Sequence, residues 1–96
     1  MKNAELALLP INQPYLFDSL IVEEQAALLK WIEQNIRGQE RRMLKYDSYK
    51  LKHLYPRYIE NGIMKGALMR SGYIPVDTRR VNWKFKKGGH LKLIQQ

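Results

Sequence analysis

The sequence predicts a single α+β domain that is mainly helical and ends in a β-hairpin. Three observations support this class. The chain has 96 residues, the size of one domain, and 45% of them are hydrophobic, which is enough to form a core. Two helix-like stretches on either side of Pro56 follow one another between residues 48 and 71. Residues 81–85 then alternate apolar and polar side chains, a period of two that is typical of a half-buried strand.

The N-terminal residues 1–20 show no helical period. Pro10 and Pro14 favour an extended arm that lies along the domain. Residues 21–87 are expected to form the folded domain, and residues 88–96 a C-terminal tail.

The first long helix is predicted over residues 22–36. Leu28 and Ile32 lie on one apolar stripe of it, and two glutamates in its first turn suit the positive end of the helix dipole. Gly38 follows as a C-cap residue.

A second helix is expected to begin at a cap formed by Asp47 or Ser48, because either side chain can accept a bond from a free backbone N–H. Pro56 disfavours helical geometry in the residue before it, so this helix should end near residue 55. Asn61 is a suitable cap for a third helix, and Gly72 supplies the left-handed residue that ends it.

The hairpin is predicted from residues 73–76 and 81–85, with the turn "DTRR" between them. Helix, short turn, helix and a hairpin with arginines at its tip is the order of a winged helix-turn-helix. In that arrangement the third helix would enter the major groove of DNA. Its inward residues are predicted to be Ile63, Met64, Ala67 and Leu68, and its outward residues Gly62, Lys65, Gly66 and Met69, with Arg70 to one side.

Two glycines within the third helix need an explanation, because a glycine inside a helix costs about 1 kcal/mol relative to alanine. Gly62 and Gly66 could leave one face of the helix without side chains, so that a phosphate backbone or another helix can approach closely. They could equally allow a tight crossing against the helix of residues 22–36.

The charge is divided unevenly along the chain. Residues 1–36 have a net charge of −3, from two lysines and five carboxylates, whereas residues 37–96 have +11, from fifteen cations and four carboxylates. Such a basic segment favours a polyanionic partner. The residues that we predict to bind nucleic acid are Lys50, Lys52, Arg57, Asn61, Lys65, Arg70, Arg79, Arg80, Asn82, Lys84, Lys86 and Lys87.

The hairpin cations are also compatible with a solvated strand edge that charge protects from association. The aromatic residues allow two interpretations as well. Tyr49, Tyr55, Tyr58 and Trp83 could stack on single-stranded bases, whereas a small core also needs large rings. We expect Trp83 in the core, and Tyr58 and Tyr73 exposed.

No catalytic or metal site is predicted, and no cofactor. The chain has no cysteine, and its histidines are far apart at His53 and His90. His53 is expected to be a packing residue or a phosphate contact. The segment "KKGGH" has no following helix that could make it a phosphate loop.

A pattern over residues 45–87 resembles a group of small, mostly uncharacterised proteins of phages and mobile elements, with a helix-turn-helix-like order. Its form is S-Y-x-L-K-H, then Y-I-x-N-G, then G-Y, then N-W-x-F. The residues that carry it are Ser48, Tyr49, Leu51, Lys52, His53, Tyr58, Ile59, Asn61, Gly62, Ala67, Leu68, Gly72, Tyr73, Asn82, Trp83 and Phe85. The resemblance implies a phage or mobile-element origin and no particular chemistry.

Together these features predict a non-catalytic nucleic-acid-binding protein, with DNA favoured over RNA. The alternative is a small basic inhibitor or accessory factor that docks on an acidic partner protein. A homodimer formed through the helix of residues 22–36 is a third possibility. No apolar run is long enough to span a membrane, and we expect a cytoplasmic location.

Overall fold

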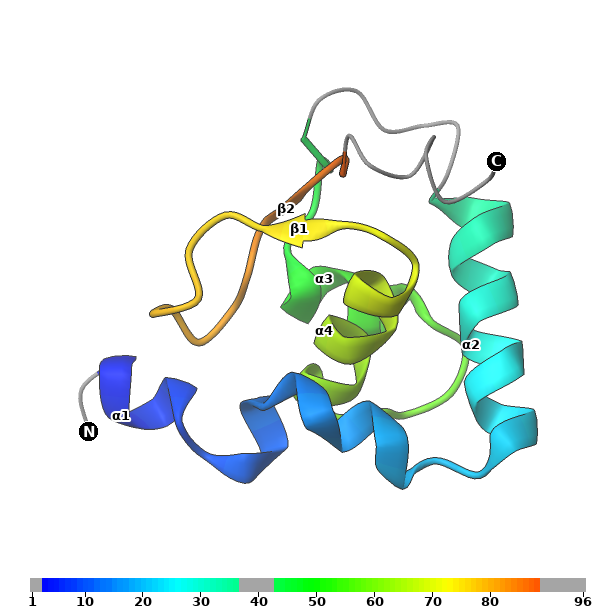
Figure 1. Cartoon of the computed structure of the whole chain (residues 1–96), viewed down its shortest axis with the longest axis horizontal. Coiled ribbons are helices and arrows are strands. Elements are labelled where there is room, and N and C mark those ends of the chain that lie inside the picture. The colour runs from blue at the N-terminus through cyan, green and yellow to red at the C-terminus, as the bar shows by residue number, and fades with distance from the viewer. Residues whose placement is uncertain (1–2, 37–42, 89–96) are drawn as a thin grey trace.

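The computed structural model describes residues 3–36 and 43–88 (Figure 1). The elements are, in order, α1 (Asn3–Ala7), η1 (Pro10–Asn12), η2 (Pro14–Ser19), α2 (Val22–Asn35), α3 (Ser48–Leu54), α4 (Asn61–Arg70), β1 (Ile74–Pro75) and β2 (Phe85–Lys86), where η denotes a 3-10 helix. The α+β class is therefore confirmed, with a two-stranded antiparallel sheet as its β component. Gly38 and residues 89–96 of the predicted tail lie outside the described part of the chain.

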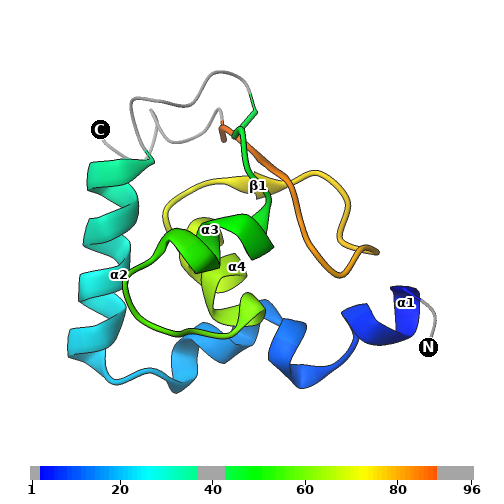
Figure 2. The same ribbon diagram turned by 180° about the vertical axis from the view of Figure 1, so that it is seen from behind.

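Helix α4 lies at the centre of the domain, with η2, α2, α3 and β1 around it (Figures 1 and 2). The four residues predicted to face inward are all buried, and Met64, Ala67 and Leu68 are inaccessible to solvent. The helix ends as predicted at Gly72, whose φ of 100° lies in the left-handed region. Tyr73 N–H donates to Leu68 O and Gly72 N–H to Met69 O, which is the Schellman pattern.

The helices on either side of the centre agree with their predicted bounds. Leu28 and Ile32 of α2 are buried against the core. Asp47 is the cap of α3, because its side chain accepts a bond from Lys50 N–H at 2.9 Å. The prediction for α4 was wrong at its start. Glu60 is the N-cap residue there, and its side chain makes no capping hydrogen bond.

The N-terminal segment is helical rather than extended, contrary to the prediction. Pro10 and Pro14 each begin a 3-10 helix, because the φ of proline is compatible with a first helical turn, whose N–H needs no partner. Phe17 of η2 is buried in the core. Segment 10–19 therefore covers one side of α4, and Figure 2 shows it running beneath that helix.

The hairpin is shorter than predicted. Ile74 pairs with Lys86 and Pro75 with Phe85, and residues 78–82 form turns and bends instead of continuing the strands. Segment 43–48 lies along the other side of the second strand, since Leu44 N–H donates to Phe85 O and Ser48 N–H to Trp83 O. These bonds join the hairpin to the start of α3.

Candidate nucleic-acid interface

Lys65 is buried in the domain, which contradicts the prediction that it faces outward from α4. Its side chain is inaccessible to solvent, and its Nζ donates to Asn12 O at 2.8 Å. The same nitrogen lies 4.1 Å from the centroid of the Trp83 ring, a cation–π distance. Burial lowers the pKa of Lys65 from 10.5 to about 8. Lys65 therefore lies inside a junction between α4, segment 10–19 and Trp83 and is not available to a nucleic acid.

The glycines of α4 allow a close crossing, but of a different element from the predicted one. A Cβ added at Gly62 would overlap backbone atoms of Gln13, and one added at Gly66 would overlap Pro14 O and the Cβ of Phe17. The neighbour is therefore segment 10–19 and not α2. Segment 10–19 therefore covers the predicted reading face of α4 at Gly62, Lys65 and Gly66, whereas Met69 at the C-terminal end of the helix is 43% exposed, as predicted.

Asn61 and Asn82, both predicted to contact nucleic acid, bond to each other inside the protein. Asn61 is buried, and its Nδ2 lies 3.0 Å from Asn82 Oδ1, 3.0 Å from Val81 O and 3.1 Å from Asn12 Oδ1. This cluster connects α4, the hairpin turn and segment 10–19. Asn61 is therefore occupied by internal contacts, whereas Asn82 is half-buried at the edge of the hairpin turn.

The two arginines at the hairpin tip turn toward a carboxylate. Arg79 Nε lies 3.0 Å from Asp77 Oδ1, and Arg80 Nε lies 3.6 Å from Asp77 Oδ2. The hydrogen bonds and charge of Arg79 lower the pKa of Asp77, and Arg80 adds a smaller effect of the same sign. The pKa of Arg79 is raised in turn. Both side chains are largely exposed, but their charge is partly neutralised.

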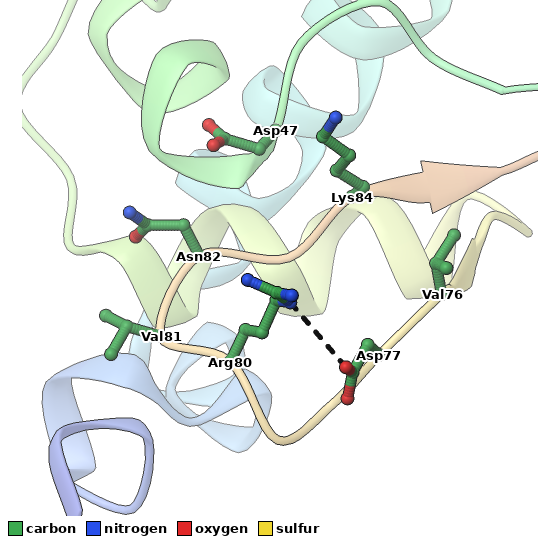
Figure 3. Close-up of a pocket in the computed structure, with 7 residues that line it drawn as sticks. All are labelled: Asp47, Val76, Asp77, Arg80, Val81, Asn82 and Lys84. Carbon is green, nitrogen blue, oxygen red and sulfur yellow. Dashed lines mark ion pairs between the residues drawn. The ribbon is translucent and has the colours of Figure 1, made fainter. Parts of the chain in front are cut away.

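An open cleft of about 470 Å³ lies beside these residues (Figure 3). Arg80 and Lys84 extend over it from the hairpin, and Asp47 faces it from the cap of α3. Cations and carboxylates are thus mixed around the cleft. Such a lining does not select an anion strongly.

Two more predicted contacts, Arg57 and Arg70, are exposed but also paired. Arg57 lies 3.7 Å from Glu24, and Arg70 lies 3.0 Å from Asp18 and covers the ring of Phe17. Exposed pairs of this kind are worth about 0–1 kcal/mol, so an incoming phosphate could compete for either guanidinium. They are secondary candidates.

Besides the buried Lys65, six lysines of residues 43–88 have no carboxylate of the described residues within 4.0 Å. We call the first three the α3 lysines and the last three the hairpin lysines: Lys45, Lys50, Lys52, Lys84, Lys86 and Lys87. Five of them are exposed and Lys52 is half-buried, with its Nζ bonded to Ile59 O at 3.2 Å. The hydrogen bonds between segment 43–48 and the second strand bring the two groups together.

Aromatic rings alternate with the α3 lysines. Lys45 and Lys50 lie 5.3 and 5.8 Å from the ring centroid of Tyr46, while Lys52 lies 5.7 Å from that of Tyr49 and 4.7 Å from that of Tyr58. We call these six residues the lysine–tyrosine surface. His53 packs edge-on against Tyr49, with ring centroids 4.5 Å apart, and is exposed as a phosphate contact would be.

Lys45 and Tyr46 were missed as site residues. The signal that would have indicated them is the alternation of lysine and tyrosine in "KYDSYK".

The other aromatic predictions had mixed outcomes. Tyr58 is 80% exposed and Trp83 is buried, both as predicted, whereas Tyr73 is only 3% exposed and that prediction was wrong. Tyr55 is half-buried against Trp31, with ring centroids 5.3 Å apart. Trp83 and Tyr55 are therefore not free to stack on a base.

Across residues 3–36 and 43–88, no group of three or more His, Cys, Asp or Glu side chains is placed to hold a metal ion. Within the same residues no helix is long and apolar enough to cross a membrane. No protein-family model, curated protein or solved structure matches this chain. The resemblance to phage and mobile-element proteins stays a prediction.

Proposed function

We propose that the protein binds nucleic acid without catalysis, through the lysine–tyrosine surface and the hairpin lysines. The observation that carries the proposal is the distribution of charge. Six lysines without carboxylate partners lie on two adjoining segments, while the arginines of residues 43–88 pair with carboxylates. Phosphates attract such lysines whatever the base sequence.

This proposal changes the docking predicted for a winged helix-turn-helix. In a winged helix-turn-helix the second helix of the pair contacts the bases, but here segment 10–19 covers most of the corresponding face of α4. In α3, Lys50 is exposed and Lys52 is half-buried, and the helix adjoins the hairpin, so we assign the contact to α3. The hairpin lysines would lie along the same phosphate backbone.

The salt dependence of binding gives an expected magnitude. If about six lysines each neutralise one phosphate, log K should fall against log salt with a slope of about −5 for duplex DNA, or about −4 for a single strand. Fluorescence anisotropy with labelled duplex and single-stranded DNA at several salt concentrations measures this slope.

Lysine-to-glutamine variants inside and outside the proposed surface test where the nucleic acid binds. Replacing Lys84, Lys86 and Lys87 with glutamine should weaken binding and make the slope about 2 to 3 units shallower. Lys30→Gln, on the exposed side of α2, should have little effect. Absence of binding to either DNA at low salt would refute the proposal. The basic surface would then be tested against acidic proteins.

A further inference from the structure

We infer that the nucleic acid is single-stranded and that its bases stack on Tyr58 and Tyr49, on either side of Lys52. This inference rests on the proposed function and adds the class of ligand. Stacking on aromatic rings beside a cationic groove is the usual mode of single-strand binding, because every base offers a π-face.

The ring of Tyr58 is held out into solvent by a fixed backbone. Its side chain is 80% exposed, although the next residue, Ile59, is only 7% exposed and belongs to the core. Lys52 Nζ bonds to Ile59 O at 3.2 Å, which ties this loop to α3. Pro56 further restricts the loop. The ring is therefore exposed on an anchored segment, so the loop loses little conformational entropy when a base binds to it.

The ammonium group of Lys52 lies close to the rings of both Tyr49 and Tyr58. Lys52 Nζ lies 4.7 Å from the Tyr58 centroid and 5.7 Å from the Tyr49 centroid. Tyr49 is 50% exposed and is further restrained by His53 at 4.5 Å. Two adjacent rings with a cation between them match two bases and the phosphate that connects them.

The same surface is poorly suited to duplex DNA. Helix α3 has seven residues and a length of about 10 Å at 1.5 Å per residue. It carries no Asn, Gln or Arg, so its two lysines are the only accessible side chains of this short helix that are typical of base-edge contacts. In a duplex the faces of the bases are already stacked, so the tyrosines would find no partner there. Of the two nucleic-acid forms, the exposed pair of rings therefore fits the unpaired strand.

The experiment compares three labelled probes of equal length by fluorescence anisotropy. They are a single-stranded deoxyoligonucleotide, the same strand with its central nucleotides abasic, and the corresponding duplex. The abasic strand keeps every phosphate but removes the central bases. Wild-type protein should bind the intact strand more tightly than either other probe.

Three variants test the rings directly. Tyr58→Leu should weaken binding of the intact strand by about 5- to 150-fold, the range expected for the loss of one stacked base. Its affinity for the abasic strand should be unchanged. Tyr58→Phe keeps the π-face and should bind like wild type. Tyr15→Leu, at a 61% exposed tyrosine in η2, is the matched control and should have no effect.

The outcomes separate this inference from the proposed function. If wild type binds the abasic strand or the duplex as tightly as the intact strand, with steep salt dependence, nucleic-acid binding stands and base stacking is refuted. Equal loss of affinity for all probes in Tyr58→Leu also refutes stacking. If no probe binds, the proposed function itself fails. Because Tyr58 lies outside the core, Tyr58→Leu should keep the wild-type thermal unfolding midpoint.

Discussion

Titration of Lys65 should make the fold more stable as the pH rises above neutrality. Its ammonium group is buried beneath segment 10–19, with Asn12 O and the Trp83 ring as its neighbours. Neither neighbour carries a charge. Desolvation therefore disfavours the charged form and lowers the pKa of Lys65 from 10.5 to about 8.

The sign follows from proton binding in the two states. Below pH 8 the lysine is charged in both, and the folded state carries the full cost of burying it. Between pH 8 and 10.5 the unfolded chain keeps a proton that the folded chain has released, so stability rises with pH. Two pKa values of 10.5 and about 8 give a gain of about 2.5 kcal/mol between pH 7 and 10.

Urea unfolding of wild type and Lys65→Met at several pH values from 7 to 10 measures this gain. Methionine has a similar length and no charge, so the free-energy difference between the proteins isolates the lysine. All other titratable groups are the same in the two proteins, so their contributions to the difference cancel. The loss of the donor to Asn12 O adds a constant offset. From pH 7 to 10 the free energy of unfolding of the wild type should rise by about 2.5 kcal/mol more than that of the variant. A difference independent of pH would refute the burial of a charged lysine.

Three further substitutions have definite expectations. Gly66→Ala should lower the free energy of unfolding by about 2 kcal/mol, because its Cβ would overlap segment 10–19. An unchanged free energy of unfolding would contradict that packing. Gln34→Ala, at an exposed position of α2, is the control. Ser48→Ala should lower the free energy of unfolding, measured with urea, by about 1–3 kcal/mol, because the buried Ser48 Oγ accepts a hydrogen bond from Trp83 N–H at 3.0 Å. Ser19→Ala, at an exposed serine, should lower it by less. Asp77→Asn should tighten DNA binding and steepen the fall of log K with log salt in anisotropy, because it releases Arg79 and Arg80 from their ion pairs. An equal effect of Glu5→Gln, at an exposed glutamate, would show that only net charge matters.

The helices could be predicted because their signals are local. The cap at Asp47, the stop before Pro56 and the left-handed Gly72 each depend on a few adjacent residues, and each is confirmed. The apolar period of α2 also required no knowledge of its neighbours.

The environment of α4 could not be predicted, because it depends on a segment about fifty positions away. Helical spacing places Gly62, Lys65 and Gly66 on the side opposite the apolar stripe, and a side without apolar residues is predicted to face solvent. Segment 10–19 forms 3-10 turns, whose short period leaves no amphipathic signal. The carbonyl of Asn12 that bonds Lys65 is invisible in the sequence, since every residue has one.

Burial and pairing also change what the net charge means. The arginines of residues 43–88 are all in ion pairs, at Arg57, Arg70, Arg79 and Arg80, while the cations there without a carboxylate partner are all lysines. This separation has a physical basis, because the planar guanidinium fork pairs well with carboxylates, whereas an ammonium is a compact and strongly hydrated charge. Lysines attract a phosphate without fixing its orientation, and tyrosine rings accept any base. A surface made of these two residue types should therefore bind strands of different sequence with similar affinity.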